Sequence, residues 1–163
     1  MKQLLQETIN GVIRILDASK KLLLNGGSDV ICAGLYTFAV EEYGKYILLK
    51  QYPPMNGEVT VDYEKIFRDK RHQNKFIAAV NDFKKQAPEC TILAKGLFDP
   101  KIYDPKIYDT TGPIIVDFQT RMAIFYCDID SKNRIKQIPS VNKTILNNAI
   151  DKLRIIATTL PTT

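Results

Sequence analysis

The side chains that could carry out chemistry lie in two short segments of the first half of the chain. The first, Glu41-Glu42-Tyr43-Gly44-Lys45, places charges in a stretch that is otherwise apolar, and the second holds the only histidine, His72, within the basic run 68–75. Imidazole titrates near neutral pH, so His72 could act as a general acid or base while a neighbouring cation stabilises charge on a phosphate. RNA suits this chemistry best, because its 2′-hydroxyl can attack the adjacent phosphate without a metal.

The charged residues around His72 form two pairs at helical spacing. Arg68 and His72 are four residues apart and share one face, while Arg71 and Lys75 share another face about a quarter turn away. In this arrangement Arg68 or Lys75 would hold the phosphate, and Lys70 and Arg71 would contact the RNA beside it. The alternative is a solvated charged face with a surface histidine.

The charges of the first segment share a helical face with small residues. Along this face stand Gly34, Thr37, Glu41, Gly44 and Lys45, at three- to four-residue spacing. Glycine in a helix interior costs up to about 1 kcal/mol relative to alanine, so we expect Gly44 to permit the close approach of another element. Glu41 and Lys45 are spaced as an i,i+4 ion pair, and Glu41 would orient the cations of the site. Alternatively, Glu41, Glu42 and Lys45 mark the one solvated edge of the helix.

Hydrophobic periodicity predicts four helices that position these segments. They are expected at about residues 2–25, from 28 or 29 to 52, 60–87 and 141–160. The run Asn25-Gly26-Gly27 ends the first helix, Ser28 or Asp29 caps the second, and Ser140 caps the last.

The second helix is expected to be the central one. Between Val30 and Val40 it has almost no polar face, so neighbouring elements must cover it on several sides. Residues 122–127 are typical of a strand, 128–134 supply a turn, and the alternation of 135–138 indicates a return strand, so a β-hairpin is predicted before the last helix. The predicted fold class is therefore mainly α, an antiparallel bundle of four main helices with a small β-hairpin, in a single domain over residues 1–163.

A tandem duplication, Asp99-Pro-Lys-Ile-Tyr followed by Asp104-Pro-Lys-Ile-Tyr, lies in a predicted loop between the third helix and the hairpin. Its Tyr103 and Tyr108 could stack on RNA bases, with lysines beside them to meet the phosphates. The alternative is a tolerated duplication in a surface loop.

Composition narrows the class of protein. A net charge of +5 and a pI near 9.0 favour polyanionic partners. The three cysteines form no CxxC pair, which argues against a disulfide framework and indicates a reducing cytoplasm. One histidine and scattered carboxylates offer no metal-ligand spacing, and neither a Gly-rich phosphate loop nor a membrane span is visible. We therefore expect a cytoplasmic protein without metal or cofactor.

Three segments of the chain resemble the AbiV family of abortive-infection proteins, within the HEPN (higher eukaryote and prokaryote nucleotide-binding) superfamily. They are Ala33-Gly-Leu-Tyr-Thr-Phe-Ala-Val-Glu-Glu-Tyr-Gly-Lys45, His72-Gln-Asn-Lys75 and Arg121-Met-Ala-Ile-Phe-Tyr-Cys-Asp128. The resemblance implies a HEPN-like helical bundle, commonly a homodimer, and a role in bacterial defence against phage. In active HEPN ribonucleases an Arg, four to six residues and a His form a metal-independent site. In this sequence three residues separate Arg68 from His72, so the role of the arginine would pass to Lys45, Lys75 or Arg71.

Three functional hypotheses follow. The first is a toxin-like, metal-independent ribonuclease that arrests translation in infected cells, with His72 as the acid or base. The short spacing from Arg68 to His72 favours the second, a non-catalytic HEPN-fold module that binds RNA, a nucleotide, or a phage-encoded or cellular protein partner. The third is a purely structural bundle in which Glu41, Lys45 and His72 face solvent on separate surfaces.

Overall fold

A computed structural model of the chain describes residues 2–51, 72–87, 90 and 142–160. These residues contain the helices α1 (Lys2–Leu24), α2 (Asp29–Gln51), α4 (His72–Gln86) and α7 (Lys143–Thr159). The prediction of a mainly α protein is therefore confirmed for this part of the chain. The predicted β-hairpin, the tandem duplication and the first half of the third predicted helix lie outside the described residues.

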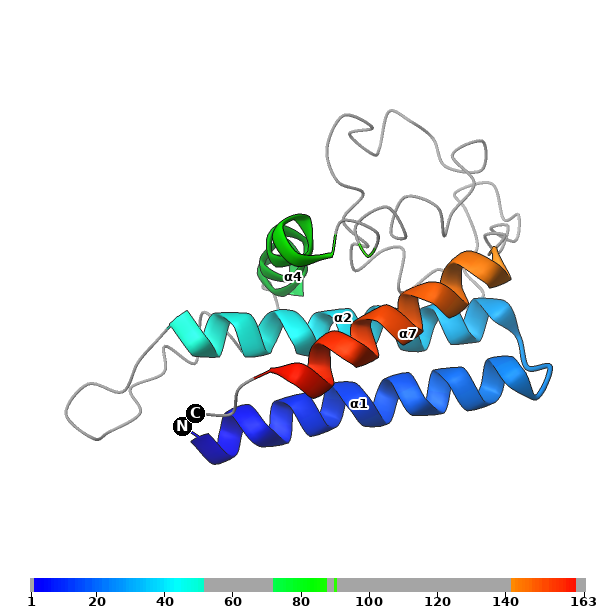
Figure 1. Ribbon diagram of the computed structural model, residues 1–163, viewed down its shortest axis with the longest axis horizontal. Coiled ribbons are helices and arrows are strands. Elements are labelled where there is room, and N and C mark those ends of the chain that lie inside the picture. The colour runs from blue at the N-terminus through cyan, green and yellow to red at the C-terminus, as the bar shows by residue number, and fades with distance from the viewer. Residues whose placement is uncertain (1, 52–71, 88–89, 91–141, 161–163) are drawn as a thin grey trace, which may run out of the picture.

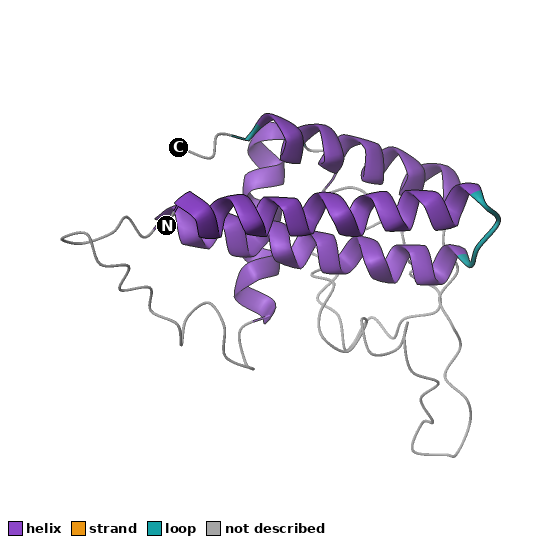
Figure 2. Cartoon of the chain, turned by 90° about the horizontal axis from the view of Figure 1, so that it is seen from below, coloured by secondary structure: helices purple, strands orange, loops and turns teal. Residues whose placement is uncertain are grey.

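The other three described helices are arranged around α2. Figure 1 shows α1 and α2 running antiparallel and side by side, with α7 lying along them. Helix α4 crosses α2 at a steep angle, so that it is seen end-on in Figure 1 and across the other helices in Figure 2. Helix α2 contacts each of the other three, which confirms its predicted central place.

The turn between α1 and α2 forms as the sequence predicts. Gly26 adopts a φ of 74°, a left-handed conformation that glycine reaches without a steric penalty. The N–H of Gly27 then donates to the carbonyl oxygen of Leu22 at 2.9 Å, the bond of a Schellman-type helix end. The hydroxyl of Ser28 accepts from the N–H of Ile31 at 3.5 Å and caps α2.

The core joins all four helices through large apolar side chains. The fully buried ones are Leu16, Leu23, Tyr43, Tyr46, Leu49, Phe76, Phe83, Leu146, Ile150 and Leu153. Each such aliphatic or phenyl side chain contributes about 1.5–3 kcal/mol when it leaves water. Helix α2 buries residues on several sides, because α1, α4 and α7 each cover part of it, whereas Leu35, Phe38 and Glu42 stay partly exposed.

Polar contacts fix α7 against α1. The ammonium group of Lys20 binds the carboxylate of Asp151 at 2.7 Å and the amide oxygen of Asn147 at 2.6 Å. The start of α7 differs from the prediction: Asn142, not Ser140, is the N-cap, and its side chain accepts from the N–H of Ile145 at 3.1 Å. Both residue types cap helices well, and the apolar pattern places the first turn only to within a few residues.

Gly44 lies where α4 touches α2. A Cβ atom at this position would collide with the carbonyl oxygen of Lys75 and lie 3.0 Å from its Cα. The backbones of the two helices are therefore in direct contact, which confirms the expected reason for this glycine.

Substitution of Gly44 by alanine should destabilise the fold by about 3 kcal/mol, because the backbone of α4 must move away from α2. Gly11→Ala is the matched control. A Cβ at Gly11, in the interior of α1, would meet no atom within 4 Å, so this change should stabilise the protein by about 0.5–1 kcal/mol. Urea unfolding of both variants measures the difference, and a Gly44→Ala protein as stable as wild type would contradict the packing described.

Candidate functional site

A buried ion pair joins α2 to α4. The ammonium nitrogen of Lys75 lies 3.2 Å from Oε1 of Glu41, and the side chains are only 9% and 6% exposed, respectively. Two charges withdrawn from water stabilise a fold only while they remain paired, because either one alone would carry its full desolvation cost. Glu41 therefore does not lie on a solvated edge of α2.

The ion pairs differ from the i,i+4 pair expected from the sequence. Glu41 binds Lys75, and Lys45 instead binds Glu42, three residues before it on the same helix. The difference arises because α4 packs on the face of α2 that carries Glu41 and Gly44. The Lys45–Glu42 pair is more open than the Glu41–Lys75 pair, with side chains 18% and 30% exposed.

The structure thus brings together two of the predicted site residues, Glu41 and Lys75. His72 is the first residue of α4, so its backbone lies one turn before Lys75. The other predicted residues, Arg68, Lys70, Arg71, Tyr103 and Tyr108, lie outside the described part of the chain. Lys75 is buried and already bound to a carboxylate. It is therefore better placed to hold α4 against α2 than to contact a phosphate directly.

A second polar contact between α2 and α4 was not predicted. The hydroxyl of Tyr43 donates to Asp82 at 2.5 Å, and the amide of Gln86 donates to the other carboxylate oxygen at 3.0 Å. The ring of Tyr43 stacks on Phe83, with centroids 5.1 Å apart. The available signal was the seven-residue spacing of Lys75 and Asp82, which places both on one face of α4.

The buried tyrosines of α2 titrate far from neutral pH. Burial raises the pKa of Tyr43, and its hydrogen bond to the Asp82 carboxylate raises that pKa further. Burial also raises the pKa of Tyr36, with a smaller contribution from Cys90.

The described residues contain no group of three or more His, Cys, Asp or Glu side chains that could hold a metal ion. No described helix is both long enough and apolar enough to cross a membrane. Comparisons with protein-family models, with curated proteins and with solved structures find no match to this chain. The AbiV resemblance therefore stays a prediction that rests on three sequence segments.

The Glu41–Lys75 pair should show strong coupling in a double-mutant cycle measured by urea unfolding at low salt. Lys75→Met removes the ammonium group that lies 3.2 Å from the buried Glu41 carboxylate and should cost about 3–5 kcal/mol, and Glu41→Gln should cost a similar amount. The double variant should be more stable than the sum of the two losses predicts, because no unpaired charge remains. The exposed Arg154–Asp17 pair is the matched control, and its removal should change stability little. Strictly additive losses at Glu41 and Lys75 would contradict the pairing.

Stability should fall at alkaline pH partly through Tyr43. Its pKa is raised in the folded state, so above about pH 10 the unfolded chain releases a proton that the folded protein keeps. Unfolding is thereby favoured as the pH rises. In Tyr43→Phe the free energy of unfolding should fall less steeply above pH 10, by about 1.4 kcal/mol per pH unit. Phe83→Leu, which alters the same cluster without removing a titratable group, should keep the wild-type slope; parallel curves for wild type and Tyr43→Phe would refute the assignment.

Proposed function

We propose that this chain is a phage-defence protein of the HEPN type that cleaves RNA without a metal, at a site beside the first turn of α4. One observation supports this proposal above the others. Glu41 and Gly44, from the first segment of the AbiV resemblance, meet Lys75 from the second segment at a buried crossing of two helices. Residues from two segments that are far apart in the sequence are thus in contact, as the residues of a common site must be.

In the proposed reaction the 2′-hydroxyl of RNA attacks the adjacent phosphorus and the 5′-oxygen of the next nucleotide leaves. His72 takes the proton from the hydroxyl or supplies one to the leaving oxygen. Glu41 holds Lys75, and this pair fixes the helix on which His72 stands. The phosphate contacts then fall to the basic residues before His72, namely Arg68, Lys70 and Arg71.

The charge of the chain agrees with RNA as the partner, because a net charge of +5 raises the local concentration of a polyanion. By analogy with the HEPN ribonucleases, whose sites are often assembled from two protomers, we include a homodimer in the proposal. A second copy of His72 near the first would then complete the site. The resulting loss of cellular RNA would arrest translation in the infected cell.

A second function, non-catalytic binding of RNA, a nucleotide or a protein partner, is favoured by the ion pairs. Lys45 and Lys75 are two of the three cations that could replace the missing arginine, and each binds a carboxylate. A neighbouring carboxylate offsets the positive charge that a phosphate would otherwise meet. If these two lysines stay bound to their carboxylates, the site would bind its partner and leave the RNA intact.

The proposal requires cleavage of end-labelled RNA in EDTA, with products that end in a 2′,3′-cyclic phosphate. His72→Ala should lower the rate at least about 100-fold, the usual contribution of a general acid or base. Asn74→Ala, at an exposed position two residues along α4, is the matched control and should cleave as the wild type does.

If His72→Ala cleaves as well as the wild type, the assignment of His72 is wrong. If the wild type leaves RNA intact but binds it with an affinity that falls steeply with salt, the non-catalytic function is correct instead.

A further inference from the structure

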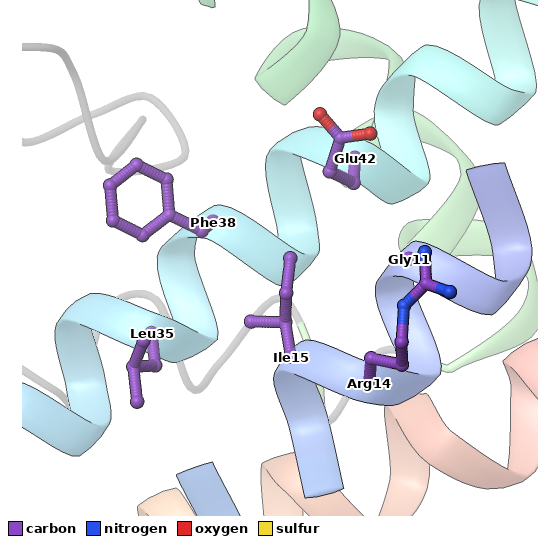
Figure 3. A pocket seen from close by; sticks show the side chains of 6 residues that line it. All are labelled: Gly11, Arg14, Ile15, Leu35, Phe38 and Glu42. Carbon is purple, nitrogen blue, oxygen red and sulfur yellow. The ribbon is translucent and has the colours of Figure 1, made fainter. Parts of the chain in front are cut away.

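A pocket of about 340 Å³ opens between α1 and α2 and shares no residue with the Glu41–Lys75 pair. Its lining residues are Gly11, Arg14 and Ile15 from α1, and Leu35, Phe38 and Glu42 from α2. Figure 3 shows Ile15 between the two helices, with Leu35 and Phe38 along α2. A volume near 300 Å³ is at the lower end of the range for small-molecule sites.

The wall of this pocket contains a glycine that no packing contact explains. Gly11 lies in the interior of α1, where glycine costs about 0.5–1 kcal/mol relative to alanine. Gly44 has a close backbone contact, but a Cβ at Gly11 would meet no atom within 4 Å. The effect of Gly11 is therefore to leave space in the pocket rather than to admit another helix.

Of the two charged residues that line the pocket, Glu42 is paired and Arg14, in the part of the chain that the structure describes, is not. Glu42 is bound to Lys45, so its charge is balanced within α2. Arg14 is exposed, and within the described ranges it has neither an ion pair nor a side-chain hydrogen bond. In Figure 3 its guanidinium group is seen at Gly11, on the α1 side of the pocket and away from Leu35 and Phe38. The pocket thus combines an apolar floor with a single cation that can bind an acidic group.

We propose that this pocket binds a small amphiphilic carboxylate. The apolar part of the ligand lies on Ile15, Leu35 and Phe38, in the space that Gly11 leaves open. The carboxylate accepts hydrogen bonds from Arg14, whose planar guanidinium matches the two oxygens. This inference is independent of the proposed RNA chemistry, because it uses different residues.

The test is an NMR titration of ¹⁵N-labelled protein with 4-phenylbutyrate and with its neutral amide, 4-phenylbutyramide. We expect saturable shifts of the amide signals in 11–15 and 35–42. A ligand of this size should bind with a Kd on the order of 1 mM. The neutral amide should bind about tenfold more weakly, since it lacks the charge-assisted hydrogen bonds to Arg14.

Arg14→Gln should weaken 4-phenylbutyrate about tenfold and leave the neutral amide unchanged. Lys21→Gln, which removes a charge from an exposed position two turns along α1, is the matched control and should bind both ligands as the wild type does. Gly11→Leu should fill the pocket and abolish the shifts that both ligands cause. The dispersion of the Gly11→Leu spectrum, compared with that of Gly11→Ala, shows whether α1 still folds in this variant.

The proposal is overturned if 4-phenylbutyrate gives no saturable shifts at 11–15 and 35–42. It is also overturned if the shifts persist in Gly11→Leu, or if Arg14→Gln weakens the acid and the amide equally.

Discussion

The buried ion pair between Glu41 and Lys75 is the interaction on which the arrangement of α2 and α4 depends. Its two charges offset their desolvation only at short range, so they specify one register of the two helices. Gly44 makes that register attainable, because it lets the backbone of α4 approach until the charges meet. Moving α4 along its axis by one helical turn, about 5.4 Å, would leave both charges buried and apart. Tyr43 and Asp82 fix the same register at a second point.

Local rules were enough to predict much of the fold. The turn at Gly26 and the cap at Ser28 follow from residue preferences within a few positions, and the central place of α2 follows from its lack of a polar face. Gly44 was predicted to lie at a close approach because glycine is costly inside a helix. The identity of the approaching helix could not be predicted, since nothing near Gly44 in the sequence specifies it.

The candidate site was predicted less well, because its contacts join residues that are far apart in the sequence. Spacing on one helix suggested a Glu41–Lys45 pair, whereas the partner of Glu41 is 34 residues along the chain. The hydrogen bond from Tyr43 to Asp82 was not predicted, because these two residues are also far apart in the sequence. The partners explain why α2 tolerates charge in an apolar stretch: Glu41 is covered by α4, and Glu42 is balanced by Lys45 at the edge of the pocket. One helix therefore supports the candidate RNA site and the proposed carboxylate pocket through different faces.

Native-state hydrogen exchange of wild type and Lys75→Met tests most directly whether the ion pair holds α4 in place. If it does, amides of Phe76, Ala79 and Phe83 in α4 will exchange faster in the variant through an opening of that helix. Amides in the core of α1 and α7, such as those of Leu16 and Leu153, will lose less protection. Unchanged exchange in α4, or an equal loss of protection in all the helices, would contradict the conclusion that Glu41 and Lys75 hold α4 against α2.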